Sequence, residues 1–250
     1  MIHAFGDSFV VGDQDDFVHD HPAGVVPDHN MGYDDRLEFL KYEVSFAAII
    51  AKNYNQQMKN YAVRGSGNLP QIDRLFNELV AGTIAPDDII LFGLTTSLRE
   101  RLVLLSFDKA TSRSYGPSLI DKELINSDNH QKILETDYYY ILSLLEQFRQ
   151  RFNVKIIACN LFDDPLSSSK EDIRHLYSFD FVVGNGARGN TLIDILNDTW
   201  GQKTCHPYHD RLVVPKGYES LYTIKKHPSI EGHKKVASWW IDNKIISHLL

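Results

Sequence analysis

Apolar residues along this chain gather in short runs that are separated by longer amphipathic stretches. Four runs are brief, rich in branched or aromatic residues, and end near Gly, Asn or Ser: Ile2–Phe5, Met58–Ala62, Ile89–Phe92 and Val154–Cys159. Such runs predict buried strands, because a strand covered on both faces reads as a continuous apolar segment.

The stretches between these runs have the spacing of amphipathic helices. In Glu43–Tyr54, for example, Phe46, Ala47 and Ile50 recur at helical intervals. The same spacing predicts helices over Leu69–Ala81, Asp137–Phe152 and Gly232–Leu250. Strands alternating with helices indicate a three-layer α/β/α sandwich around a mostly parallel, flavodoxin-like sheet of about five strands. In such sheets ligands bind beyond the carboxyl ends of the strands.

Three stretches interrupt the alternation: Gly12–Arg36, Ser106–Gln131 and Asp163–Leu221. At 250 residues the chain suits one large domain. We therefore expect a single domain over residues 1–250 with loop insertions near 12–36, 106–131 and 163–221. Long loops in compact domains are often functional.

Composition narrows the classes of protein. The chain has 33 acidic and 26 basic residues, a net charge of −7, which opposes sequence-independent binding of nucleic acid. No run approaches the roughly 18 apolar residues of a membrane span, and no signal peptide is visible. Neither Cys159 nor Cys205 lies in a CxxC pair, which favours a reduced chain. We expect a cytoplasmic or otherwise soluble protein that binds no nucleic acid and no membrane.

The first candidate for chemistry is Ser8, in the sequence FGDSF directly after the first predicted strand. One interpretation is a helix cap, since serine satisfies free backbone N–H groups well. The other is a nucleophile at the carboxyl end of a strand. Ser8 by itself does not decide between them.

Three further blocks follow later strands. In NYAVRGSGN (60–68) the glycines allow a sharp turn that presents backbone N–H groups to a ligand, although an ordinary turn with Asn68 opening the next helix is the alternative. In GLTTSLR (93–99) the hydroxyls could cap a helix or donate hydrogen bonds into the same crevice. In HPSIEGH (227–233), His227 is either a base for a serine or a surface histidine, and Ser229 can cap the closing helix.

Taken in this order, FGDSFVVG, NYAVRGSGN, ILFGLTTS and HPSIEGHKKVA resemble the motifs of the SGNH or GDSL-type hydrolase superfamily, and look closest to its phage and environmental members. The resemblance implies that Ser8 attacks an ester carbonyl and that His227 takes its proton. It places the backbone N–H groups of Ser8 and Gly65, with the residue at Thr95, around the oxyanion. It implies a serine esterase or deacetylase without a cofactor, acting on a small acyl ester or an O-acetylated glycan. A phage origin would make a virion-associated location possible.

Two positions depart from the family pattern. Thr95 stands where the family has the oxyanion asparagine, and Asn68 in the neighbouring block is a candidate substitute. Ile224 stands where the triad aspartate is expected; the nearest upstream acid is Glu219, and Asp210 is another possible support. Loss of the orienting acid can cost orders of magnitude in rate. The alternatives are therefore a Ser–His dyad, a substitute acid, or a catalytically impaired protein that binds a glycan or a protein partner.

Other chemically suggestive segments match no defined site. His19, His21 and His29 lie among loosely spaced aspartates, and Cys205, His206 and His209 have no second ligand pair, so we expect no metal. GNGARGN (184–190) lacks the spacing of a dinucleotide site. Trp239 and Trp240 are expected to serve in packing.

Overall fold

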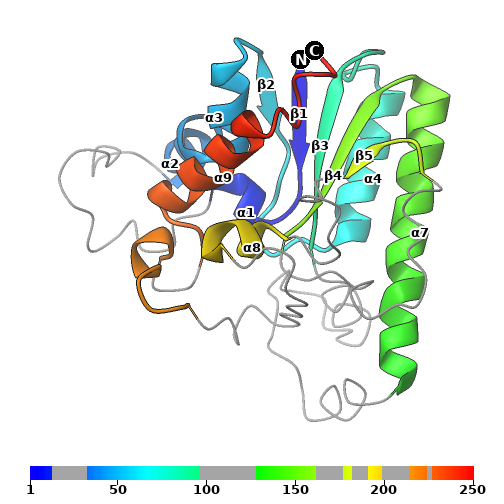
Figure 1. Cartoon of the computed structure of the whole chain (residues 1–250). Helices are drawn as coiled ribbons and strands as arrows, with labels where there is room; N and C mark the ends of the chain where they lie inside the picture. Colours follow the sequence, from blue (N-terminus) through cyan, green and yellow to red (C-terminus); the bar gives the residue numbers. More distant parts are fainter. Residues whose placement is uncertain (13–32, 96–127, 162–176, 182–190, 199–213, 224–226) are drawn as a thin grey trace.

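The computed structural model describes residues 1–12, 33–95, 128–161, 177–181, 191–198, 214–223 and 227–250. Its centre is a parallel sheet with the strand order β2-β1-β3-β4-β5. The strands are β1 (Ile2–Phe5), β2 (Met58–Asn60), β3 (Ile89–Leu94), β4 (Lys155–Asn160) and β5 (Asp180–Phe181). This architecture confirms the predicted fold class. Because every pairing is parallel, all five carboxyl ends lie at one edge of the sheet (Figure 1).

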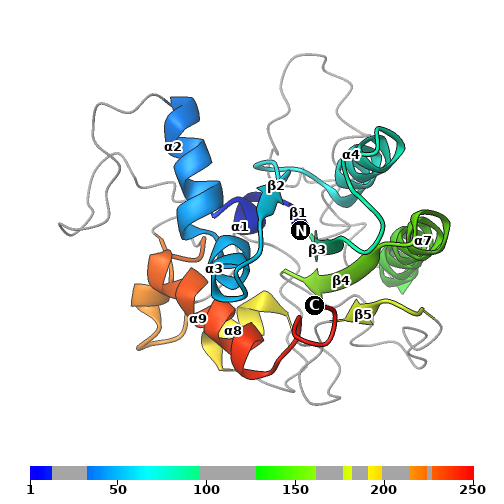
Figure 2. The same cartoon turned by 90° about the horizontal axis from the view of Figure 1, so that it is seen from above.

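Helices cover both faces of the sheet (Figures 1 and 2). One face carries α1 (Ser8–Val11), α3 (Phe46–Asn53), α8 (Leu192–Asn197) and α9 (Ile230–Asp242), and the other carries α4 (Asn68–Val80) and α7 (Asp128–Phe152). We call these the α9 face and the α7 face. Helix α2 (Tyr33–Phe39) lies at the edge of the α9 face, where Leu37 packs against the core.

The three central strands, β1, β3 and β4, each contribute side chains to two separate hydrophobic cores. In β3, Ile89 and Leu91 pack on the α9 face, whereas Ile90 and Phe92 pack on the α7 face. This division follows from the two-residue period of a strand, which sends successive side chains to opposite sides. Every residue of β1 and β3 is buried, which explains why both strands were recognisable as continuous apolar runs.

Local capping sets several helix boundaries that apolar spacing alone placed differently. Helix α3 begins at Phe46 and not at Glu43, because the Ser45 hydroxyl accepts a hydrogen bond from the Ala48 N–H at 3.2 Å. The preceding Leu40–Val44 form one π-helical turn. The closing helix ends at Asp242, earlier than predicted.

The stretches expected to be irregular hold regular structure where the structure describes them. Residues 33–36 belong to α2, and residues 128–131 form the start of α7. Within 163–221 lie β5, α8 and a 3₁₀ turn at Glu219–Leu221. Apart from α7, these elements have only two to seven residues, too few for an apolar period to be recognised in the sequence. Among the described residues, no helix is long and apolar enough to cross a membrane.

Candidate active site

The turn from β1 into α1 places Ser8 at the carboxyl edge of the sheet. Gly6 has φ +149°, and Asp7 is the N-cap of α1, its carboxylate accepting from the Phe9 N–H at 2.9 Å. The capping role that Ser8 was a candidate for therefore belongs to Asp7. Ser8 is the first helical residue, which leaves its hydroxyl to other chemistry.

Ser8 and His227 form a direct hydrogen bond. The Ser8 Oγ and His227 Nε2 atoms are 2.9 Å apart, and the two residues are only 4% and 8% exposed. They are 219 positions apart in sequence and meet because α1 and α9 share one hydrophobic core. The structure thus brings together the predicted nucleophile and the predicted base.

Backbone and ring contacts hold His227 in place. Its N–H donates to the Thr223 hydroxyl at 3.1 Å, and its carbonyl accepts from the Thr223 N–H at 2.8 Å. The Phe9 ring lies against the imidazole with centroids 5.4 Å apart. Two residues further on, Ser229 caps α9 by accepting from the Gly232 N–H at 3.2 Å, as predicted.

Thr95 and Asn68 are linked to Asp7, the residue before Ser8, by hydrogen bonds within the protein. The Thr95 hydroxyl donates to the Asp7 carboxylate at 2.9 Å. The Asn68 amide accepts from the Thr95 N–H and donates to the Thr95 carbonyl, both at 2.9 Å. A hydroxyl has one proton to donate, so in this arrangement Thr95 supports the cap of α1. The predicted part of Thr95 in the oxyanion site would require this bond to rearrange. Asn68 has a second amide N–H besides the one that bonds the Thr95 carbonyl, so its predicted part requires no such change.

Two backbone donors remain for an oxyanion. Gly65 occupies the left-handed region at φ +68°, in a turn closed by the Ser66 N–H bonding the Val63 carbonyl at 3.1 Å. Within the part of the chain that the structure describes, neither the Ser8 nor the Gly65 N–H donates to a protein acceptor. Both glycine-assisted turns follow neighbouring strands, β1 and β2, at the same sheet edge.

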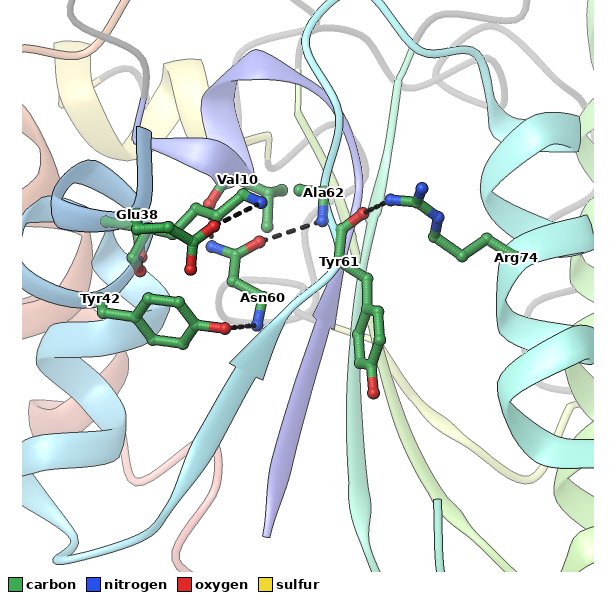
Figure 3. Close-up of polar contacts among 9 residues, drawn as sticks. Val10, Glu38, Tyr42, Asn60, Tyr61, Ala62 and Arg74 are labelled. Atoms are coloured by element: carbon green, nitrogen blue, oxygen red, sulfur yellow. Dashed lines mark hydrogen bonds and ion pairs between the residues drawn. The ribbon is translucent and has the colours of Figure 1, made fainter. Parts of the chain in front are cut away.

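Asn60, at the end of β2, ties the second turn to the helix that bears Ser8 (Figure 3). Its amide donates to the Val10 carbonyl at 2.9 Å and accepts from the Ala62 N–H at 3.0 Å. The Tyr61 and Val63 N–H groups still bond the Ala4 and Gly6 carbonyls of the β1 segment, so the Ala62 N–H lies on the outer side of this edge strand. The strand ends at Asn60, earlier than the predicted Ala62. The neighbouring Tyr61 carbonyl accepts from Arg74 of α4 at 2.7 Å (Figure 3). A buried amide at the end of an apolar run was the available sequence signal for this role.

His233, in the same motif as His227, has a structural role that the sequence did not indicate. Its Nδ1 accepts from the Phe46 N–H at 3.3 Å, and its ring stacks on Phe46. Burial, with the charge of the neighbouring His227, lowers the pKa of His233 to about 3. His233 is therefore neutral at physiological pH and bonds α9 to the first turn of α3.

Of the other candidate support acids and metal ligands, only some lie among the residues that the structure describes. Glu219 is exposed and its carboxylate accepts from the Gly217 N–H at 2.7 Å, within its own turn. Among the residues the structure describes, no group of three His, Cys, Asp or Glu could hold a metal ion. Outside the described residues lie Asp210, Ile224, the histidines at 19, 21 and 29, the cluster at 205–209, and GNGARGN.

Comparison with known proteins gave structural likeness only. No protein-family model matches the sequence, and no curated protein matches it. A member of the lipolytic protein G-D-S-L family from Veillonella parvula is 12% identical, with a TM-score of 0.48, over 96% of this chain and 96% of that one. An alpha/beta hydrolase enzyme from the metagenome of Lake Arreo, Spain, is 13% identical, with a TM-score of 0.46, over 99% and 94%.

A third similar structure is that of a carbohydrate esterase whose active site displays divergent catalytic and non-catalytic binding functions. It is 14% identical, with a TM-score of 0.42, over 98% of this chain and 67% of that one. At these identities and TM-scores the likeness decides nothing about the chemistry of this chain.

Proposed function

We propose that this protein is a serine esterase in which Ser8 is the nucleophile and His227 the general base. The observation that carries the proposal is the 2.9 Å contact between Ser8 Oγ and His227 Nε2 at the carboxyl edge of the sheet. A buried serine within hydrogen-bond reach of an imidazole is the arrangement that activates a hydroxyl for attack. The two backbone N–H groups of Ser8 and Gly65 are the accompanying oxyanion donors.

The reaction follows from these positions. Ser8 Oγ attacks the ester carbonyl carbon as its proton passes to His227 Nε2, and the carbonyl oxygen takes the negative charge beside the backbone donors. Collapse expels the alcohol, which receives the proton from His227, and leaves an acyl-serine. Water then attacks the acyl group by the same route, releasing the acid and restoring Ser8. Removing one oxyanion donor typically costs about 3–4 kcal/mol of transition-state stabilisation.

We propose a short acyl group, such as O-acetyl, as the substrate, with a carbohydrate as one source of the alcohol. Ser8 is 4% and His227 8% exposed, so the reacting atoms accept a small group more readily than a long acyl chain. On p-nitrophenyl esters we expect acetate to be hydrolysed faster than octanoate. Equal or faster turnover of octanoate would contradict the short-acyl assignment.

A second candidate function is binding of an acylated glycan or a protein partner without turnover. Ile224, in the position where the family places the acid that orients the histidine, favours this alternative. The two candidates differ in whether Ser8 is chemically activated, and that can be measured directly.

The test is intact mass after exposure to a fluorophosphonate, for the wild type, Ser8→Ala and Ser143→Ala. Ser143 is a serine of α7 whose hydroxyl bonds the Tyr139 carbonyl, so its variant is a matched control. We expect one adduct on the wild type and on Ser143→Ala, and none on Ser8→Ala. A folded wild-type protein that takes no adduct would contradict the esterase proposal and favour binding.

A further inference from the structure

A buried glutamine of α4 connects the two turns that carry the backbone donors. The Gln71 Oε1 atom accepts from the Gly6 N–H at 3.2 Å, two residues before Ser8. Its Nε2 donates to the Ser66 hydroxyl at 2.9 Å, one residue after Gly65. Gln71 is 3% exposed and lies in the first turn of α4. One side chain therefore bonds both turns at once.

The second turn is fixed from the other side as well. The Ser66 hydroxyl donates to the Gly67 carbonyl at 3.2 Å. Three hydrogen bonds thus run in a chain from the Gly6 N–H through the Gln71 amide and the Ser66 hydroxyl to the Gly67 carbonyl. The turns themselves are glycine-rich, with Gly6 and Gly65 at positive φ. Glycine resists such conformations less than other residues but also holds them less firmly. The backbone joins the two turns on one side, where the Val63 N–H donates to the Gly6 carbonyl at 3.0 Å. The Gln71 side chain adds a second link, through the Gly6 N–H and the Ser66 hydroxyl.

We infer that Gln71 is a positioning residue that holds the Ser8 and Gly65 N–H groups at the separation an oxyanion requires. The inference rests on the proposed esterase function. The Thr95 hydroxyl bonds Asp7 and the Asn68 amide bonds the Thr95 backbone, so neither restrains these two donors. Gln71 does, through the Gly6 N–H and the Ser66 hydroxyl. Because oxyanion donors act only at a defined distance from the developing charge, a small change in their separation lowers the rate.

The experiment measures how fast a fluorophosphonate modifies Ser8, together with kcat and KM for p-nitrophenyl acetate. Gln71→Met keeps the length of the side chain and removes both bonds. We expect it to lower the modification rate and kcat by about 10- to 100-fold while KM changes little, because the donors act on the transition state. Gln71→Glu can still accept from the Gly6 N–H, and from the Ser66 hydroxyl if that hydroxyl gives up its bond to the Gly67 carbonyl. Because it keeps at least one of the two links, we expect a smaller loss of rate than for Gln71→Met.

Two further variants separate positioning from folding. Ser66→Ala removes one of the two bonds, and we expect a smaller loss, on the order of 3- to 10-fold. Ile72→Val shortens the adjacent buried side chain of α4 without touching either turn, and we expect it to lower the free energy of unfolding while the modification rate stays at the wild-type value. If Gln71→Met does not fold, Ser66→Ala and Gln71→Glu still decide the question.

The outcomes are distinguishable. Modification of Gln71→Met and Ser66→Ala at the wild-type rate would overturn the role of Gln71 and leave the esterase proposal standing. A parallel fall in rate for Ile72→Val would also overturn it, because general loosening of α4 would then explain the effect. No modification of the folded wild type would overturn the esterase proposal and the role of Gln71 with it.

Discussion

At the scale of single residues, the Gly6 position allows no side chain. Its φ of +149° lies where other residues rarely go, and a Cβ there would stand 2.5 Å from Val10 Cγ2 and 3.2 Å from the Gly93 carbonyl oxygen. Val10 is equally close to Gly93, where a Cβ would also meet its Cγ2 at 2.5 Å. Helix α1 thus sits directly on the ends of β1 and β3, which brings Ser8 to the sheet edge.

We expect Gly6→Ala to destabilise the protein by about 2–4 kcal/mol, from backbone strain together with overpacking against Val10. Urea unfolding followed by circular dichroism measures this. Gly82→Ala is the matched control, because Gly82 also has positive φ (+70°) but nothing lies within 4 Å of its Cβ position. Gly82→Ala should lower the free energy of unfolding through backbone strain alone, by about 1 kcal/mol. Equal losses in the two variants would show that contact with Val10 contributes nothing.

At the scale of elements, the helices of the α9 face are joined by specific polar contacts as well as by apolar packing. His233 accepts from the Phe46 N–H at the start of α3, and Trp240 of α9 lies against Phe46 with ring centroids 5.7 Å apart. The motif HPSIEGH therefore contains both the proposed base, His227, and an anchor for α3, His233. A neutral imidazole is required for the second role, because Nδ1 must accept.

The stability of this contact depends on pH. The pKa of His233 is about 3 in the folded protein, below the ordinary value of 6.5, so the unfolded chain binds this proton more readily. Its contribution is complete above pH 6.5 and is lost as the pH falls toward 3, by about 1.4 kcal/mol for each unit. Between pH 7 and pH 5 we expect His233 to account for a loss of about 2 kcal/mol in the free energy of unfolding.

The variant His233→Asn tests this, because an asparagine oxygen can accept from the Phe46 N–H but does not titrate. Its free energy of unfolding should change less between pH 7 and pH 5 than that of the wild type. His3, whose burial also lowers its pKa, contributes equally to both proteins and cancels in the comparison. The same pH dependence in both would show that His233 is not the titrating group.

At the scale of the whole molecule, the sheet divides the protein into two cores, and the helices next to Ser8 and His227 belong to one of them. Helix α1 begins at Ser8, and helix α9 begins three residues after His227. Both helices pack on the α9 face. The α7 face contributes Asn68 and Gln71 from the start of α4. Truncations in the two cores should therefore differ in their effect on the site even when they cost similar stability.

Val236→Ala on the α9 face and Val154→Ala on the α7 face are a matched pair, because both valines are buried. Each should lower the free energy of unfolding by about 1–3 kcal/mol. The rate of fluorophosphonate modification is compared at a temperature well below the unfolding midpoint of each variant. Val236→Ala should lower this rate by about 3- to 10-fold, because it lets His227 move relative to Ser8. Val154→Ala should change it by less than about twofold. Equal slowing in both variants would contradict a site held by one core.

The sequence by itself determined those features that depend on local residue patterns, namely the buried strands and the helix caps. Buried parallel strands read as apolar runs, so β1, β3 and β4 were predicted within two residues at each end. Ser229 as a cap and Asn68 as the first residue of α4 follow from the same local rules. The order of the motifs pointed to Ser8 and His227 together, although no local signal places them in contact.

Only the tertiary structure decided which polar groups meet. The Thr95 hydroxyl, predicted to face an oxyanion, bonds Asp7 from 88 positions away, and Gln71 reaches Gly6 across 65. The two-residue strand β5 is held by its pairing with β4, and the six-residue helix α8 by a capping box. Both are too short to show a hydrophobic period in the sequence. A side chain's type states which bonds it can make, but its partner is chosen by which strand ends the parallel sheet brings to one edge.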